Sequence, residues 1–106
     1  MNQSSALTQS LAESQERHAH TTVVTYTVYT ESKPNLSRLI ARYFPGATIH
    51  YGLGLWQEQT EPSATISIVG TFADLQRIAD LAGDIRVVNE QSTVLVTWQR
   101  CSRLDV

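Results

Sequence analysis

The chain has 106 residues, a length that can bury one hydrophobic core without disulfide bonds or a structural metal. Eight basic and ten acidic residues leave a formal net charge of -2, which excludes both a strongly basic nucleic-acid-binding surface and a strongly acidic nucleic-acid mimic. The single cysteine, Cys101, forms no internal disulfide, as is usual in a reducing compartment. We therefore expect one cytoplasmic domain that does not bind nucleic acid.

Residues 1–20 differ in composition from the rest of the chain, because they are rich in Gln, Ser and Ala. They lack the basic start and apolar run of a secretory signal, and the composition predicts a disordered or loosely helical tail. His18 and His20 would share a face of an extended strand, but further ligands at suitable spacing are missing, so we predict a linker and no metal site. No run of about eighteen apolar residues occurs, so no membrane span is expected.

The folded domain is expected to begin at residue 21. In "TTVVTYTVYTE" the residues Val24, Tyr26 and Val28 alternate with threonines, which predicts a half-buried strand. A short amphipathic helix is predicted over residues 35–44. Its apolar positions follow the i, i+3, i+4, i+7 spacing: Leu36, Leu39, Ile40 and Tyr43. Pro45 and Gly46 are expected to end that helix.

The stretch "YGLGLWQEQTEPS", residues 51–63, predicts a strand followed by a turn. The odd positions from 47 to 55 are apolar and are expected to face the core: Ala47, Ile49, Tyr51, Leu53 and Leu55. The even positions are expected on the opposite face: Thr48, His50, Gly52, Gly54 and Trp56. There the glycines either allow close packing of another group or let the strand twist and bulge. A partner strand over residues 64–68 follows.

A second helix is predicted from Thr71, which with Asp74 resembles a capping box, to a stop at Gly83. Residues 85–88 form a short segment that pairs either within the main sheet or at its edge. A last strand is predicted over residues 93–99, and residues 101–106 are expected to be a C-terminal tail.

The order β-α-β-β-α-β predicts an α+β, ferredoxin-like domain over residues 21–100, an antiparallel sheet with both helices on one face. The other sheet face is then left open. Its expected members are Thr25, Thr27, Tyr29, His50, Gly52, Gly54, Trp56, Thr65, Ser67, Thr93, Leu95 and Thr97. Because several are aromatic or aliphatic, we predict that a second copy covers this face in a homo-oligomer, a dimer or trimer; the alternative is a solvated face.

Catalytic motifs are missing from the sequence: it has no triad, no acid/base pair and no Walker lysine, and "GLG" lacks a dinucleotide fingerprint. We therefore predict no catalytic residue and no cofactor, and His50 is interpreted as a surface or interface histidine. The candidate ligand-binding or partner-binding residues are Tyr29, His50, Gly52, Gly54 and Trp56. One hypothesis has Trp56 stacking on a planar ligand while an arginine of a neighbour, Arg38, Arg42 or Arg86, reaches an anion.

The element order, the "G-x-G-x-W" hairpin and the short terminal strand resemble the PII-like and CutA-like group of ferredoxin-fold proteins. That resemblance implies trimers with ligands in clefts between subunits. "YFPGATIHYGLGLW", "EPS" and "EQSTVLVTW" also resemble a family of small uncharacterised bacterial proteins with an "FP-G-T…G-x-G-x-W" core, over about residues 22–99. The PII signature and its long modifiable loop are missing, so no PII ligand contact is assigned to a residue here.

Three functions remain open at this point. The first is a non-enzymatic, oligomeric small-molecule binder or regulator, in which Trp56 and the glycines face the ligand. The second is a protein-interaction module, such as an accessory or viral inhibitor protein, that uses the open sheet face or an edge strand. The third is a small ferredoxin-fold enzyme, with His50 and Tyr29 as candidates for proton transfer. The residue inventory favours binding over chemistry.

Overall fold

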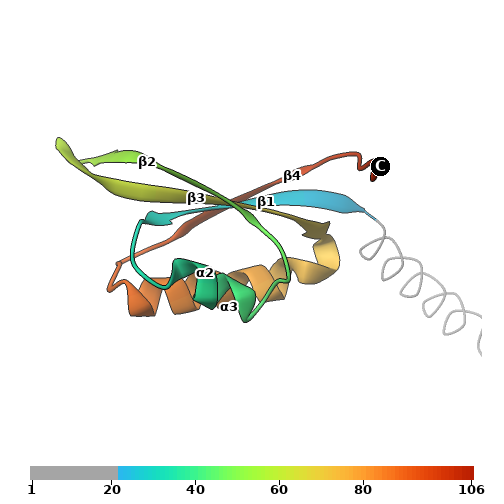
Figure 1. Cartoon of the computed structure of the whole chain (residues 1–106), viewed down its shortest axis with the longest axis horizontal. Coiled ribbons are helices and arrows are strands. Elements are labelled where there is room, and N and C mark those ends of the chain that lie inside the picture. Colours follow the sequence, from blue (N-terminus) through green and yellow to red (C-terminus); the bar gives the residue numbers. More distant parts are fainter. Residues whose placement is uncertain (1–21) are drawn as a thin grey trace, which may run out of the picture.

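A computed structural model of the chain describes residues 22–106, so the predicted disordered tail and the histidines His18 and His20 lie outside the described residues. The elements are β1 (Val23–Glu31), α2 (Leu36–Ala41), β2 (Thr48–Trp56), β3 (Gln59–Thr71), the short helix η1 (Phe72–Asp74), α3 (Leu75–Val88) and β4 (Leu95–Arg100). The strands form an antiparallel sheet in the order β2-β3-β1-β4, and both helices lie on one of its faces (Figure 1). The α+β, ferredoxin-like prediction is confirmed.

The core lies between the sheet and the helix layer, where the alternation of β1 places Val24, Tyr26 and Val28 with no exposed surface. Their neighbours on the helices include Ile78 and Leu81, which are equally buried. The Tyr26 hydroxyl donates a hydrogen bond of 2.6 Å to the carbonyl oxygen of Thr71, so the buried phenol keeps a polar partner. None of the helices in the described part of the chain is long and apolar enough to cross a membrane.

The predicted end of the second helix at Gly83 is wrong, because α3 continues to Val88. Ile85 is fully buried and extends the apolar stripe by one turn beyond Leu81, so core packing carries the helix past the glycine. The helix ends at Val88, and two residues beyond it Glu90 has a positive φ of 55°, while the Gln91 amide donates to the carbonyl oxygen of Arg86 over 2.9 Å. Residues 85–88 are thus helical and pair with no strand.

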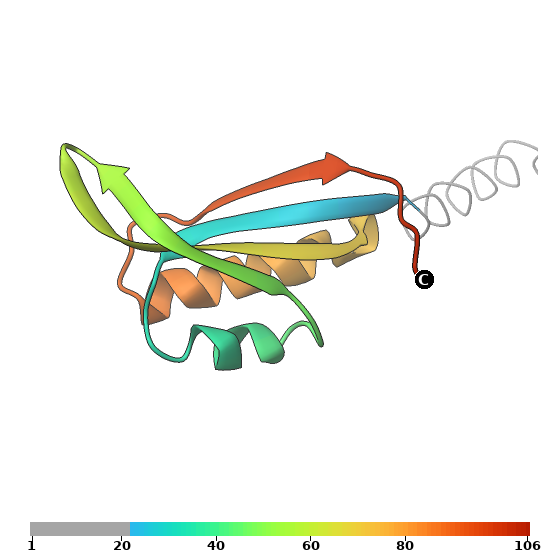
Figure 2. The ribbon, with the colours of Figure 1, turned by 45° about the horizontal axis from the view of Figure 1, so that its top comes forward.

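The β2–β3 hairpin extends beyond the ends of both helices and bends away from the helix layer (Figures 1 and 2). Pairing of Ile49 with the buried Ile66 places the odd residues of β2 on the helix side, as predicted. Their burial was wrongly predicted, because Tyr51, Leu53 and Leu55 are 65%, 74% and 74% exposed. The reason is that α2 has only six residues, about 9 Å of helix, and does not reach under the hairpin.

Candidate functional site

The predicted site residues lie on the sheet face opposite the helices. His50 on β2 pairs with Thr65 on β3, and Thr65 pairs with Tyr29 on β1, so these three side chains form one row across the sheet. Leu95 on β4 extends the row, because it is the direct partner of Tyr29. Antiparallel partners point to the same face, which places the even positions of β2 on this open face as well.

A cleft of about 520 Å³, called here the aromatic cleft, lies between the outer part of the hairpin and the segment that joins α3 to β4. Its lining residues are Tyr29, Thr30, Glu31, Gly54, Leu55, Trp56, Glu61, Glu90, Gln91, Ser92, Thr93 and Leu95. The cleft therefore brings together Tyr29, Gly54 and Trp56 of the predicted set. His50 and Gly52 share the open face but do not line this cleft.

Side-chain hydrogen bonds hold the α3–β4 wall of the aromatic cleft against the end of β1. Thr30, a buried polar residue with 6% exposure, donates from its hydroxyl to Gln91 Oε1 over 2.5 Å. The same oxygen accepts from the backbone amide of Glu31 at 3.3 Å and from Asn89 Nδ2 at 3.2 Å. Gln91 Nε2 in turn donates to the carbonyl oxygen of Thr93 over 3.3 Å. This network joins the α3–β4 segment to the end of β1.

The charged residues that line the aromatic cleft are all glutamates: Glu31, Glu61 and Glu90. Glu31 is paired with Lys33, whose Nζ lies 3.4 Å from Glu31 Oε2. The arginines proposed as anion ligands lie elsewhere in the chain. Arg38 and Arg42 line a separate cavity of about 290 Å³ beside α2 and the end of α3. The cleft within one chain thus has acidic character.

The glycines of β2 do not produce a bulge, because the pairing of β2 with β3 is continuous from Thr48 to Trp56. A Cβ on Gly54 would lie 3.3 Å from Cβ of Ser63 and 3.6 Å from the carbonyl oxygen of Glu61. A Cβ on Gly52 would make only an ordinary contact, 3.8 Å from the Ser63 hydroxyl. Gly54 therefore allows β2 and β3 to lie close together within the hairpin, whereas Gly52 leaves room above the open face.

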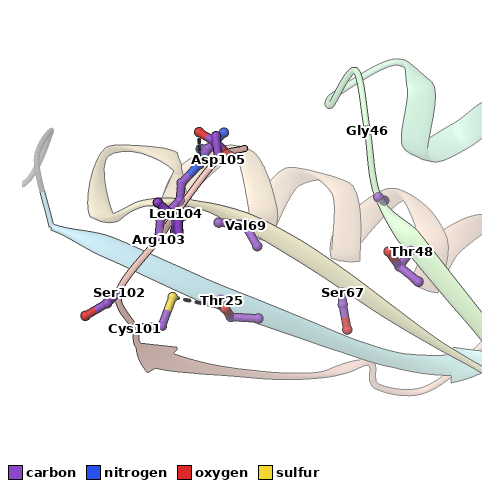
Figure 3. A pocket seen from close by; sticks show the side chains of 11 residues that line it. Thr25, Gly46, Thr48, Ser67, Val69, Cys101, Ser102, Arg103, Leu104 and Asp105 are labelled. Atoms are coloured by element: carbon purple, nitrogen blue, oxygen red, sulfur yellow. Dashed lines mark hydrogen bonds and ion pairs between the residues drawn. The ribbon is translucent and has the colours of Figure 1, made fainter.

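A second cleft, of about 590 Å³, lies on the same sheet face near the start of β2 and is bordered by the C-terminal tail (Figure 3). The backbone of the C-terminal tail is held against β1, because the Cys101 amide donates to the carbonyl oxygen of Val23 over 3.1 Å. Cys101 Sγ lies 3.2 Å from the hydroxyl of Thr25, and Arg103 pairs with Asp105 at 3.0 Å. This cleft could not be predicted from the sequence, because the path of an irregular tail follows from no periodicity.

Sequence reasoning also missed the acidic rim of the aromatic cleft. Glu61 could have been found, because a two-residue turn at Gln57 and Glu58 places it opposite Gly54. Glu90 had no such signal, because glycine or asparagine is the usual residue at the positive-φ position that it occupies. Within residues 22–106, no group of three or more His, Cys, Asp or Glu side chains is arranged to hold a metal ion.

Comparison with known proteins gives information on the fold. No protein-family model matches the chain, and no curated protein matches it. Its structure is similar to the crystal structure of a DUF3240 family protein from Shewanella baltica OS155, with a TM-score of 0.60 and 11% sequence identity. The match covers 81% of this chain and 97% of that chain. At this identity the likeness shows a shared fold alone, and the PII-like and CutA-like resemblance stays a prediction.

Proposed function

We propose that the protein is a non-enzymatic small-molecule-binding or regulatory protein that acts as a homo-oligomer in the cytoplasm. The observation that carries this proposal is the aromatic cleft, which joins Tyr29 and Trp56 from separate strands around a volume of about 520 Å³. Small-molecule sites are clefts of about 300–1,000 Å³ with apolar and aromatic walls and a few polar groups. Leu55, Leu95 and the hydrogen-bonded loop supply those walls here.

The exposed hairpin supports the oligomeric part of the proposal. Tyr51, Leu53 and Leu55 form a continuous apolar stripe on β2, each at least 65% exposed. Contiguous exposed apolar side chains on a small domain are typical of an interaction surface, because removing apolar surface from water lowers the free energy. A second copy of the chain would bury the stripe, and the resemblance to the PII-like and CutA-like group favours a trimer. The number of subunits is part of the test.

Size-exclusion chromatography with light scattering tests the oligomer. We expect the wild type to elute as a dimer or trimer and Leu53→Glu to elute as a monomer, because the new carboxylate would be buried without a partner. Val87→Glu is the matched control, since Val87 is an apolar side chain with 66% exposure on α3, and it should keep the wild-type mass. A monomeric wild type would remove the oligomer from the proposal.

A thermal-shift screen tests ligand binding independently. A ligand that binds the native state raises its melting temperature by mass action, and Trp56→Leu should reduce that rise for any ligand of the aromatic cleft. A broad screen of metabolites in which nothing raises the melting temperature would contradict the proposal.

An alternative function, a protein-interaction module, is favoured by one observation. β2 is an edge strand of the sheet, so its outer backbone groups are available for pairing with an extended segment of another protein. Its apolar side chains Leu53 and Leu55 would then give specificity. A small enzyme is less well supported, because Thr65 separates His50 from Tyr29 in the row across the sheet. Pull-down mass spectrometry with the wild type and with Leu53→Glu separates the first two functions.

A further inference from the structure

We infer that the aromatic cleft binds a small organic cation, an amine or a quaternary ammonium ion. This inference rests on the proposed ligand-binding function and adds the chemical class of the ligand. It is carried by the aromatic walls of the cleft, by the sign of its charged groups and by the rigidity of its loop wall.

The walls of the cleft offer two aromatic side chains with accessible surface. Trp56, at the end of β2, is 67% exposed, and Tyr29, on β1, is 41% exposed. Both line the same cleft although their strands are not neighbours in the sheet. Aromatic faces carry the negative part of the ring quadrupole, and they attract ammonium groups placed over them. Two such residues around one volume suit a cation with an apolar surface, such as a methylated ammonium ion.

The charges of the cleft select against an anion. Glu61 and Glu90 line it without a basic residue among the lining residues, while Glu31 shares its charge with Lys33. A carboxylate near a ligand charge attracts a cation and repels an anion, and the interaction strengthens as the two charges approach. A phosphate or carboxylate ligand would therefore be repelled by the same groups that attract an ammonium ion. Within one chain, this disfavours a nucleotide stacked on Trp56.

The acidic wall is also fixed in position. Glu90 lies in the segment held by the Thr30–Gln91 hydrogen bond, and its backbone has a positive φ of 55°. A ligand that docks there does not need to order the loop, so less of its binding energy is lost to conformational entropy.

Isothermal titration calorimetry with four probes tests the inference. Choline and spermidine represent the quaternary ammonium and amine classes. The carbon isostere of choline, in which a tert-butyl group replaces the trimethylammonium group, is neutral, and AMP is an anion with a planar base. We expect at least one cation to bind, its neutral counterpart to bind at least fivefold more weakly, and AMP to show no binding. Raising the salt concentration should weaken cation binding, because screening reduces the attraction of the glutamates.

Variants locate the binding in the cleft. Glu61→Gln and Glu90→Gln should each weaken cation binding about fivefold, and Trp56→Leu should weaken it by a similar factor. Glu58→Gln is the matched control, because it removes the same charge from the same hairpin outside the cleft lining, and it should leave the affinity unchanged. Circular dichroism of each variant separates lost binding from lost folding.

The outcomes are distinguishable from a failure of the proposed function. Binding of AMP or of the neutral isostere as tightly as choline would overturn the cation inference and leave the binding function intact. If Glu58→Gln weakens cation binding as much as Glu61→Gln does, the cation inference is also overturned. The charge of the whole hairpin would then be responsible for binding. If no probe binds, the cation inference is wrong, and the thermal-shift screen with Trp56→Leu decides the binding function separately.

Discussion

Gly54 on β2 and Ser63 on β3 are diagonal neighbours in the sheet, so close that a Cβ on the glycine would lie 3.3 Å from Cβ of the serine. This is tighter than an ordinary van der Waals contact, so the serine would have to move slightly. Gly52 is the direct pairing partner of the same serine, and a Cβ on it would lie 3.8 Å from the serine hydroxyl, which leaves room for a methyl group. The space available to a side chain therefore differs between these two glycines, although they lie only two residues apart on one strand.

The two glycines give a matched pair of variants. Gly52→Ala should raise the free energy of unfolding by about 0.5–1 kcal/mol, because alanine loses less backbone entropy on folding. Gly54→Ala should show no such gain or should destabilise the protein, because of its contact with Ser63. Urea unfolding measures both. If Gly52→Ala lowers the oligomer mass or ligand affinity instead, the space above Gly52 is filled by a second subunit or a ligand.

The hairpin turn is built from two residues with positive φ, Gln57 at 48° and Glu58 at 65°, as in a type I′ turn. Asn and Gly occupy these positions at lower cost. The double substitution Gln57→Asn with Glu58→Gly should stabilise the protein by about 1 kcal/mol, or raise Tm by about 5 °C. The order Gln57→Gly with Glu58→Asn is the control, since it has the same composition and should stabilise less. An unchanged Tm for the Asn-Gly variant would contradict the turn geometry.

The start of the second helical segment depends on Gly70. The Asp74 carboxylate accepts from the Thr71 backbone amide at 2.9 Å and closes a capping box, but a Cβ on Gly70 would lie 2.5 Å from Asp74 Oδ2. Gly70→Ala should displace that carboxylate and cost about 1 kcal/mol of stability. Gly83→Ala, in the helix interior with nothing within 4 Å, should instead stabilise by up to about 1 kcal/mol. Thermal unfolding of both variants checks the opposite signs.

Two tyrosines make stability depend on alkaline pH. The hydrogen bond that the Tyr43 hydroxyl donates to Asp84 raises the pKa of that phenol above 10.0, and burial followed by the Asp74 charge raises the pKa of Tyr26. Because the folded state favours the protonated phenols, their contribution is complete below about pH 10 and is lost as the pH rises through the folded pKa.

Urea midpoints measured between about pH 8 and pH 11 test this dependence. Wild-type stability should fall above about pH 10, and Tyr43→Phe should lower stability below that pH and show a shallower fall above it. Tyr51→Phe is the control, because Tyr51 is 65% exposed on the hairpin, and it should keep the wild-type pH profile. A Tyr43→Phe profile parallel to the wild type would show that the bond to Asp84 does not contribute.

The order of the elements and the faces of the central strands could be predicted from the sequence because they depend on local periodicity. The alternation around Tyr26 gives the buried face of β1, and the continuous pairing of β2 keeps His50 and Trp56 on the other face, as their even positions predicted. The helix stop at Gly83 was wrong because a glycine is a weak local signal, and the burial of Ile85 outweighs it.

The aromatic cleft depended on tertiary structure, because its parts are far apart in the chain. Periodicity determined that Tyr29 and Trp56 share the open face, but only the path of the hairpin and of the α3–β4 segment placed Glu61 and Glu90 beside them. The same holds for Leu53, whose apolar character and face follow from the sequence while its exposure follows from the shortness of α2. Local sequence specifies which way a side chain points, whereas packing between distant segments decides what, if anything, covers it.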